Sequence, residues 1–114
     1  MTQRDRDALG DIVRAMERAC GFPIPDKATL LTTDYLQDAL IRCLEVIGEA
    51  SKRLSHELRD QHPQVPWRSM AGMRDLLIHA YDTVDLEETW EAYKLFPGLR
   101  EEICRILGDT PLNP

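Results

Sequence analysis

Residues 33–61, TDYLQDALIRCLEVIGEASKRLSHELRDQ, carry the longest periodic pattern in the chain. Their apolar residues recur at steps of three and four, the spacing that places side chains on one face of an α-helix. The stripe consists of Leu36, Leu40, Cys43, Ile47, Ala50, Leu54 and Leu58. Ala39 and Val46 widen it, which leaves room for an intrachain face and a dimer face. We expect one long helix here, ended by His62-Pro63.

The sequence on either side of this stretch predicts further helices and no strand. Helical spacing marks residues 4–20, 67–81, 85–96 and 97–107. Gly21, Pro23 and Pro25 predict a loop over residues 21–31. Gly72 predicts a division within the 67–81 segment.

The boundaries of the last two helices have their own signals. Asp85-Leu-Glu-Glu88 matches a capping box with Asp85 as N-cap. Pro97 suits the first turn of a helix, and Gly108 suits a stop. Short connections favour antiparallel neighbours, so we expect an all-α, up-and-down bundle of four to five antiparallel helices. The length fits a single domain over residues 1–114, with 109–114 as a loose tail.

Composition narrows the class of protein. The three cysteines have no CxxC spacing, which favours buried apolar thiols in a reduced compartment over a zinc site or disulfides. No apolar run is long enough for a membrane span, and residues 1–7 lack the apolar core of a signal peptide. We therefore expect a cytoplasmic protein. The net charge of −6 argues against simple nucleic-acid binding, but residues 42–74 carry +2, with six basic and four acidic residues.

One histidine stands apart from the rest. His79 lies in the apolar run Leu76-Leu-Ile-His-Ala80, whereas His56 and His62 sit among polar residues. Asp75 precedes it by four residues, so on a helix the carboxylate and the imidazole can meet. Such a contact fixes the imidazole tautomer and raises its pKa.

Arg74 and Tyr81 complete a reactive group around His79. Arg74 lies about 140° from His79 around an ideal helix but nearly in line with Tyr81. A full site therefore needs a bent arginine, a distorted helix or a second subunit. Arginine clamps a phosphate, and histidine transfers protons near neutral pH, which together suit RNA cleavage without a metal. No carboxylate cluster or HExxH spacing supports a metal site.

The run Met73-Arg-Asp-Leu-Leu-Ile-His-Ala-Tyr81 resembles the R-x4-H-x-Y motif of HepT-like (DUF86) toxins in the HEPN ribonuclease superfamily. Residues 42–54, 66–74 and 84–90 resemble the family's second helix, the approach to its catalytic helix and the helix that follows. Asp75 departs from the asparagine of many members. The resemblance covers about residues 5–107.

This resemblance implies a metal-independent endoribonuclease toxin of a type II/VII-like toxin–antitoxin pair, with Arg74 and His79 catalytic and no cofactor. It implies a homodimer whose two motifs face a shared cleft. It also implies a minimal nucleotidyltransferase (MNT) antitoxin that transfers AMP to Tyr81 and so silences the enzyme. Asp75 and Tyr81 would support the site.

Other residues are weaker candidates. Arg42, Lys52, Arg53 and Arg68 are expected to hold RNA phosphates. Glu49 and Arg53 either line the cleft or form an ordinary i,i+4 ion pair. Trp67 and Trp90 are expected to be core or interface anchors. Two other functions stay open: a non-catalytic nucleotide-binding or adapter subunit of a nucleotidyltransferase complex, and a structural bundle with a buried histidine.

Overall fold

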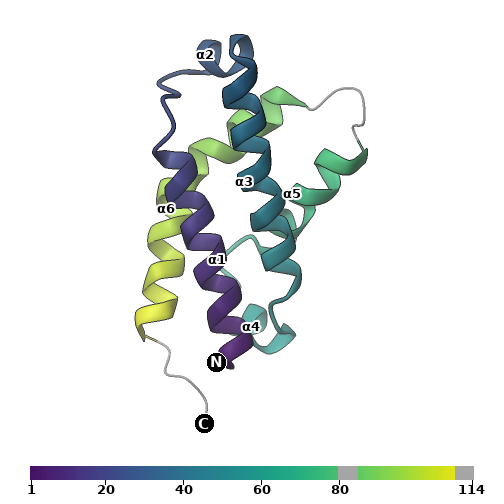
Figure 1. The fold of residues 1–114 in the computed structure, drawn as a ribbon. Helices are drawn as coiled ribbons and strands as arrows, with labels where there is room; N and C mark the ends of the chain where they lie inside the picture. Colours follow the sequence, from purple (N-terminus) through teal and green to yellow (C-terminus); the bar gives the residue numbers. More distant parts are fainter. Residues whose placement is uncertain (80–84, 110–114) are drawn as a thin grey trace.

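The computed structural model describes the backbone of residues 1–79 and 85–109, and the side chains of residues 1–74 and 85–108. Within these ranges the chain forms six helices and no strand. They are α1 (Gln3–Cys20), α2 (Lys27–Thr32), α3 (Asp34–Lys52), α4 (His56–Gln61), α5 (Trp67–His79) and α6 (Leu86–Asp109). In Figure 1, α1, α3 and α5 alternate in direction, and the second half of α6 runs beside α1. The predicted all-α, up-and-down bundle is confirmed.

The core lies where α3 packs between α1 and α5, with α6 on the other side of α1. Every residue of the predicted stripe from Leu36 to Leu58 is buried. From α1, Leu9, Ile12 and Met16 are fully buried against it. Burying such side chains contributes about 1.5–3 kcal/mol each, so the contact between α1 and α3 stabilises the fold.

The prediction of one long helix over residues 33–61 was wrong, because the helix breaks after Lys52. Ser55 restarts the chain as the N-cap of α4, with its hydroxyl accepting a hydrogen bond from the Leu58 amide at 3.1 Å. The Arg59 guanidinium donates to the Ser51 carbonyl at the end of α3, at 2.8 Å. These side chains satisfy backbone groups that a continuous helix would have satisfied itself. The apolar spacing persists across the break, so the pattern alone could not reveal it.

Two predictions about shorter elements were also wrong. Residues 27–31 of the expected 21–31 loop belong to α2, because Asp26 caps this helix by accepting from the Thr29 amide at 2.8 Å. Gly72 does not divide α5, which is continuous from Trp67 to His79. A Cβ at position 72 would meet nothing within 4 Å, so this glycine lies in open space.

The two helices expected over 85–96 and 97–107 are one helix, α6, with Pro97 inside it. Asp85 caps α6 as predicted, by accepting from the Glu88 amide at 3.1 Å. The two halves of α6 run in different directions in Figure 1, as expected for a proline within a helix. Burial of Phe96 and Ile103 on either side of the proline outweighs the lost hydrogen bond. Gly108 does not stop the helix, which ends at Asp109.

The cysteines are all free, and only Cys43 fits the expectation of a buried thiol fully. Cys20 is exposed because it is the last residue of α1, and Cys104 is half-buried.

Of the tryptophans, Trp67 is buried, and Trp90 packs partly buried against the core. None of the helices in the described ranges combines the length and apolar character needed to cross a bilayer.

Asp5 joins the start of α1 to the break between α3 and α4. Its carboxylate accepts from the backbone amide and the hydroxyl of Ser55, at 2.8 and 2.7 Å, and the side chain is only 2% exposed. Burial raises the pKa of the Asp5 carboxyl, but the hydrogen bonds from Ser55 and Thr2 lower it more, so the net pKa is below its ordinary 3.8.

We expect Asp5→Asn to lower the free energy of unfolding by about 1–3 kcal/mol at neutral pH, because the Ser55 donors lose a charged acceptor. Since the folded-state pKa is depressed, this stabilisation is complete above the pKa of unfolded Asp and is lost as pH falls through the folded pKa. Urea denaturation at neutral and acidic pH measures both effects.

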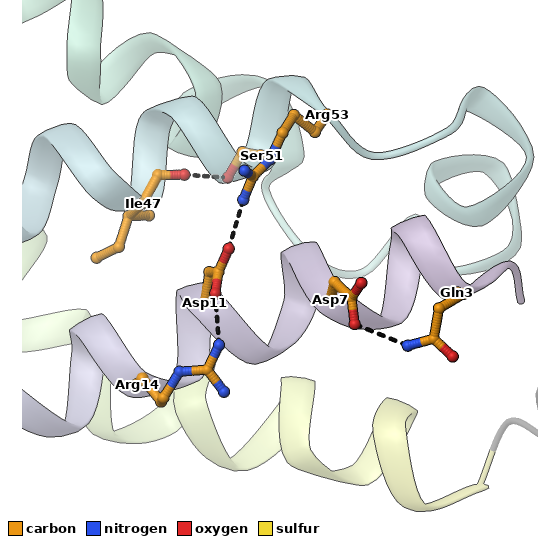
Figure 2. Close-up of polar contacts among 7 residues, drawn as sticks. All are labelled: Gln3, Asp7, Asp11, Arg14, Ile47, Ser51 and Arg53. Atoms are coloured by element: carbon orange, nitrogen blue, oxygen red, sulfur yellow. Dashed lines mark hydrogen bonds and ion pairs between the residues drawn. The ribbon is translucent and has the colours of Figure 1, made fainter.

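Asp7→Asn is the matched control, because the exposed Asp7 accepts from Gln3 of its own helix (Figure 2) and has no side-chain partner on another helix in the described part of the chain. Its cost should be a few tenths of a kcal/mol. Equal losses in the two variants, or an Asp5→Asn loss that does not shrink in acid, would contradict this assignment.

Candidate active site on helix α5

The motif helix α5 is anchored at its start. The indole nitrogen of Trp67 donates to the His62 carbonyl at 2.8 Å, and the Trp67 side chain is buried. One turn later, Met70 is fully buried in the core. These contacts fix the first half of α5 against α3, so the position of Arg74 is set by packing.

Arg74 lies where α5 crosses α3 at Gly48. A Cβ built on Gly48 would lie 2.6 Å from the backbone nitrogen of Arg74 and 2.8 Å from its Cβ. Gly48 does not have a positive φ, so its backbone conformation is open to any residue. The position requires glycine because a larger side chain would collide with α5. The two helix backbones therefore approach beside Arg74 more closely than a side chain at position 48 would allow.

The Arg74 side chain is held by a carboxylate from the same part of α3. Its Nε lies 3.0 Å from Oε1 of Glu49, and the two side chains are 41% and 57% exposed. A guanidinium has five N–H donors, and one carboxylate cannot satisfy them all. Arg74 is thus oriented at the surface with donors left for an anion.

His79 is the last residue of α5. Because the helix is continuous, positions 74 and 79 lie about 140° apart around its axis. The side chains of Asp75 and His79, and the whole of Tyr81, lie outside the described residues. The predicted Asp75–His79 contact and the alignment of Tyr81 with Arg74 remain predictions.

The proposed RNA-binding residues do not form one cluster. Arg42, Lys52 and Arg53 are exposed and lie along α3 with Glu49. Arg53 bonds Asp11 of α1 at 2.6 Å, and Glu49 bonds Arg74, so the i,i+4 pair considered for Glu49 and Arg53 was wrong.

Arg68 lies apart from these residues. It lines an open groove of about 490 Å³ at the start of α5, together with Arg59 and Trp67. It precedes Arg74 by six residues, about 120° around the helix. The structure therefore does not bring Arg68 together with Arg74.

Sequence reasoning missed two features of this site. Gly48 was not recognised, although a lone glycine inside an apolar helical stripe is itself a signal of close packing. The partner of Glu49 was also missed, since contacts between helices leave no spacing signature. Among the residues with described side chains, no group of three or more His, Cys, Asp or Glu residues could hold a metal ion.

Comparisons with known proteins show the family of the chain. A family model described as Ribonuclease HepT-like matches residues 12–106. "Putative RNase MJ0125" of Methanocaldococcus jannaschii is 38% identical over 112 residues, which cover 96% of this chain and 97% of that protein. "Probable ribonuclease HepT" of Thermococcus cleftensis is 41% identical over 99 residues, covering 82% of this chain and 86% of the relative.

A longer protein also matches. "Gamma-glutamylcyclotransferase and putative RNase MJ0434" of M. jannaschii is 47% identical over 83 residues, or 72% of this chain. The match spans only 37% of that protein's length, so its double name does not carry over to this chain. No solved structure matches the chain. The family model covers most of the helical bundle, including Arg74 and His79, and the chain belongs to the Ribonuclease HepT-like family.

Proposed function

We propose that this chain is a metal-independent endoribonuclease, acting as the toxin of a toxin–antitoxin pair in the cytoplasm. The observation that carries the proposal is the fixed position of Arg74. Gly48 sets the helix crossing beside it, and Glu49 holds its guanidinium at the surface of the helix that also bears His79. Membership of a ribonuclease family supports RNA as the substrate.

The reaction uses the ribose itself as the nucleophile. A base removes the 2′-hydroxyl proton, and the 2′-oxygen attacks the adjacent phosphorus. The bond from phosphorus to the 5′-oxygen then breaks, and an acid protonates that oxygen. The products are a 2′,3′-cyclic phosphate and a 5′-hydroxyl, and the step consumes no cofactor.

The motif residues fit the parts of this reaction. His79 transfers a proton, because an imidazole acts as base or acid near neutral pH. Arg74 binds the phosphate and stabilises the charge that builds up on its oxygens. Asp75 orients His79 if the two side chains meet across one helical turn.

A two-fold homodimer would complete the site. The separation of about 140° between positions 74 and 79 does not suit one phosphate on a straight helix. A second copy of α5 across a shared cleft would supply the missing group. Sedimentation at micromolar concentration should give twice the mass of the chain, and a monomer that cleaves RNA at full rate would refute this part.

The direct test is incubation of the purified, unmodified chain with single-stranded RNA in EDTA. Cleavage in the absence of free divalent cations is expected. No cleavage together with tight nucleotide binding would instead favour the adapter subunit of a nucleotidyltransferase complex.

We also propose that an MNT-type antitoxin silences the enzyme by transferring AMP to Tyr81. The added phosphate would place negative charge beside Arg74 and His79 and repel RNA. After co-expression with the partner, mass spectrometry should find AMP on the peptide that contains Tyr81. Tyr81→Phe should lack the adduct, whereas Tyr35→Phe should keep it, since Tyr35 is exposed but lies on α3. Adducts on other residues alone would refute the switch.

A further inference from the structure

A concave surface between α1 and α3 gathers arginines that the motif does not include. The groove has a volume of about 200 Å³. Arg14 and Arg18 line it from α1, and Arg42, Cys43 and Val46 line it from α3. Arg14 and Arg18 are four residues apart, so they follow one another along the same face of α1.

The charge of this groove is positive although the chain is acidic overall. Asp11 is the only carboxylate in its lining, against three arginines. Asp11 is already shared between Arg14 and Arg53, as Figure 2 shows, so its negative charge is compensated. The groove therefore presents a local excess of positive charge in a chain of net charge −6.

The arginines also keep donors for a ligand. Arg42 reaches Glu45 only at 3.5 Å, and both side chains are well exposed. Within the described part of the chain, the guanidinium of Arg18 has no hydrogen-bond or ion-pair partner. Exposed pairs of this kind contribute little, so an anion of higher charge density can displace Glu45.

Part of the groove lining is apolar. It is formed by the buried Cys43 and the partly buried Val46. Burial raises the pKa of the Cys43 thiol, while the positive charges of Arg18 and Arg42 act on it in the opposite direction. Arg18 from α1 and Arg42 from α3 line the groove beside Cys43.

The α3 residues that line the groove are close in sequence to the residue that holds Arg74. Val46 lines the groove, and Glu49, which holds Arg74, is three residues further along the helix. Arg42 precedes Glu49 by seven residues, two turns and about 10 Å, on nearly the same face. Neighbouring phosphates of one RNA strand can thus contact Arg42 and Arg74 together.

We propose that the groove between α1 and α3 binds the phosphate backbone of single-stranded RNA beside the bond that is cut at Arg74. The inference rests on the proposed nuclease function and adds Arg14 and Arg18 to the substrate-binding surface. Arginine forks suit phosphate oxygens, and a row of them along a groove follows a backbone rather than a base sequence. The groove binds RNA of any sequence and raises affinity without taking part in the chemistry.

The test is the double variant Arg18→Gln/Arg42→Gln, which removes one cation from each side of the groove. For a long single-stranded RNA, KM should rise about tenfold or more while kcat stays the same. Cleavage of a dinucleotide, which is too short to reach the groove, should not change. The slope of log affinity against log salt should fall by about 1.4, since each phosphate contact on a single strand contributes about 0.7.

Arg105→Gln is the matched control. Arg105 is exposed and forms an i,i+3 ion pair with Glu102 on α6, like that of Arg42 with Glu45, but lies outside the groove. This variant should keep the wild-type KM and salt slope. Circular dichroism checks that the double variant is folded.

Binding is measured separately from cleavage, by fluorescence anisotropy with an RNA in which every 2′-hydroxyl is methylated, so that no nucleophile for cleavage is present. Weaker RNA binding by the double variant supports the groove as an RNA-binding surface, even if the wild-type chain does not cleave RNA. In that case only the proposed nuclease function fails. If the wild-type chain cleaves RNA, an unchanged RNA affinity and salt slope in the double variant would overturn the proposal that the groove binds RNA. So would a loss of self-association with normal RNA binding, since the surface would then belong to a second copy of the chain.

Discussion

Arg74→Ala will lower the rate of RNA cleavage by about 100- to 1000-fold, the effect of removing one group that stabilises transition-state charge. The fold should survive, because the Arg74 and Glu49 side chains are 41% and 57% exposed and an ion pair at the surface contributes about 0–1 kcal/mol. Arg74→Lys should recover only part of the rate, since an ammonium keeps the charge but not the planar fork. Initial rates with one defined RNA measure all three proteins.

His79→Ala should cause a similar loss, in the range of about 100- to 10,000-fold for a group that transfers protons. His62→Ala serves as the control, because His62 contributes its backbone carbonyl, not its imidazole, to the contact with Trp67. If the site is shared between subunits, mixing inactive Arg74→Ala and His79→Ala chains should restore part of the activity. Full activity in either single variant would refute the assigned roles.

The second large effect is expected at Gly48, which no chemical motif includes. Gly48→Ala should lower the free energy of unfolding by about 1–3 kcal/mol, the usual cost of overpacking a core. The added Cβ would meet the backbone nitrogen of Arg74 at 2.6 Å, so α3 and α5 must move apart. Because the contact is with Arg74 itself, cleavage should fall by about 100-fold, as expected for a displacement near 1 Å at a catalytic group.

Gly72→Ala is the matched control, since Gly72 lies on α5 two residues before Arg74 and a Cβ there meets nothing within 4 Å. This variant should be more stable than wild type by about 0.5–1 kcal/mol, because alanine favours a helix over glycine. Urea denaturation and the cleavage assay are run on both variants. Equal behaviour of the two would show that the helix crossing at Gly48 does not position Arg74.

The helices could be predicted from the sequence because apolar spacing reports directly on burial. Every stripe residue from Leu36 to Leu58 is buried, and Asp85 caps α6 as expected. The errors at Lys52 and Pro97 fell where tertiary contacts, rather than the local sequence, decide the outcome. The break after Lys52 depends on Asp5, fifty residues away in sequence from Ser55. The continuity of α6 through Pro97 depends on burial of Phe96 and Ile103, which helix propensities do not include.

The candidate site divides in the same way. The motif Arg74 to Tyr81 is local in sequence, so it could be recognised from one segment. What fixes Arg74 in place comes from α3, through Gly48 and Glu49, and no pattern within α5 predicts it. Of the arginines that line the groove, the sequence predicted only Arg42 as an RNA-binding residue. Arg14 and Arg18 lie on α1, and only the packing of α1 against α3 brings them close to Arg42.

The most direct measurement of the central claim compares two substrates of the same sequence in EDTA, one an all-ribose RNA and the other with 2′-deoxyriboses throughout. The account predicts that the unmodified wild-type chain cleaves only the first, leaves 2′,3′-cyclic phosphate ends, and loses this activity in His79→Ala. Equal cleavage of both substrates, or cleavage that appears only when a divalent cation is added back, would contradict it.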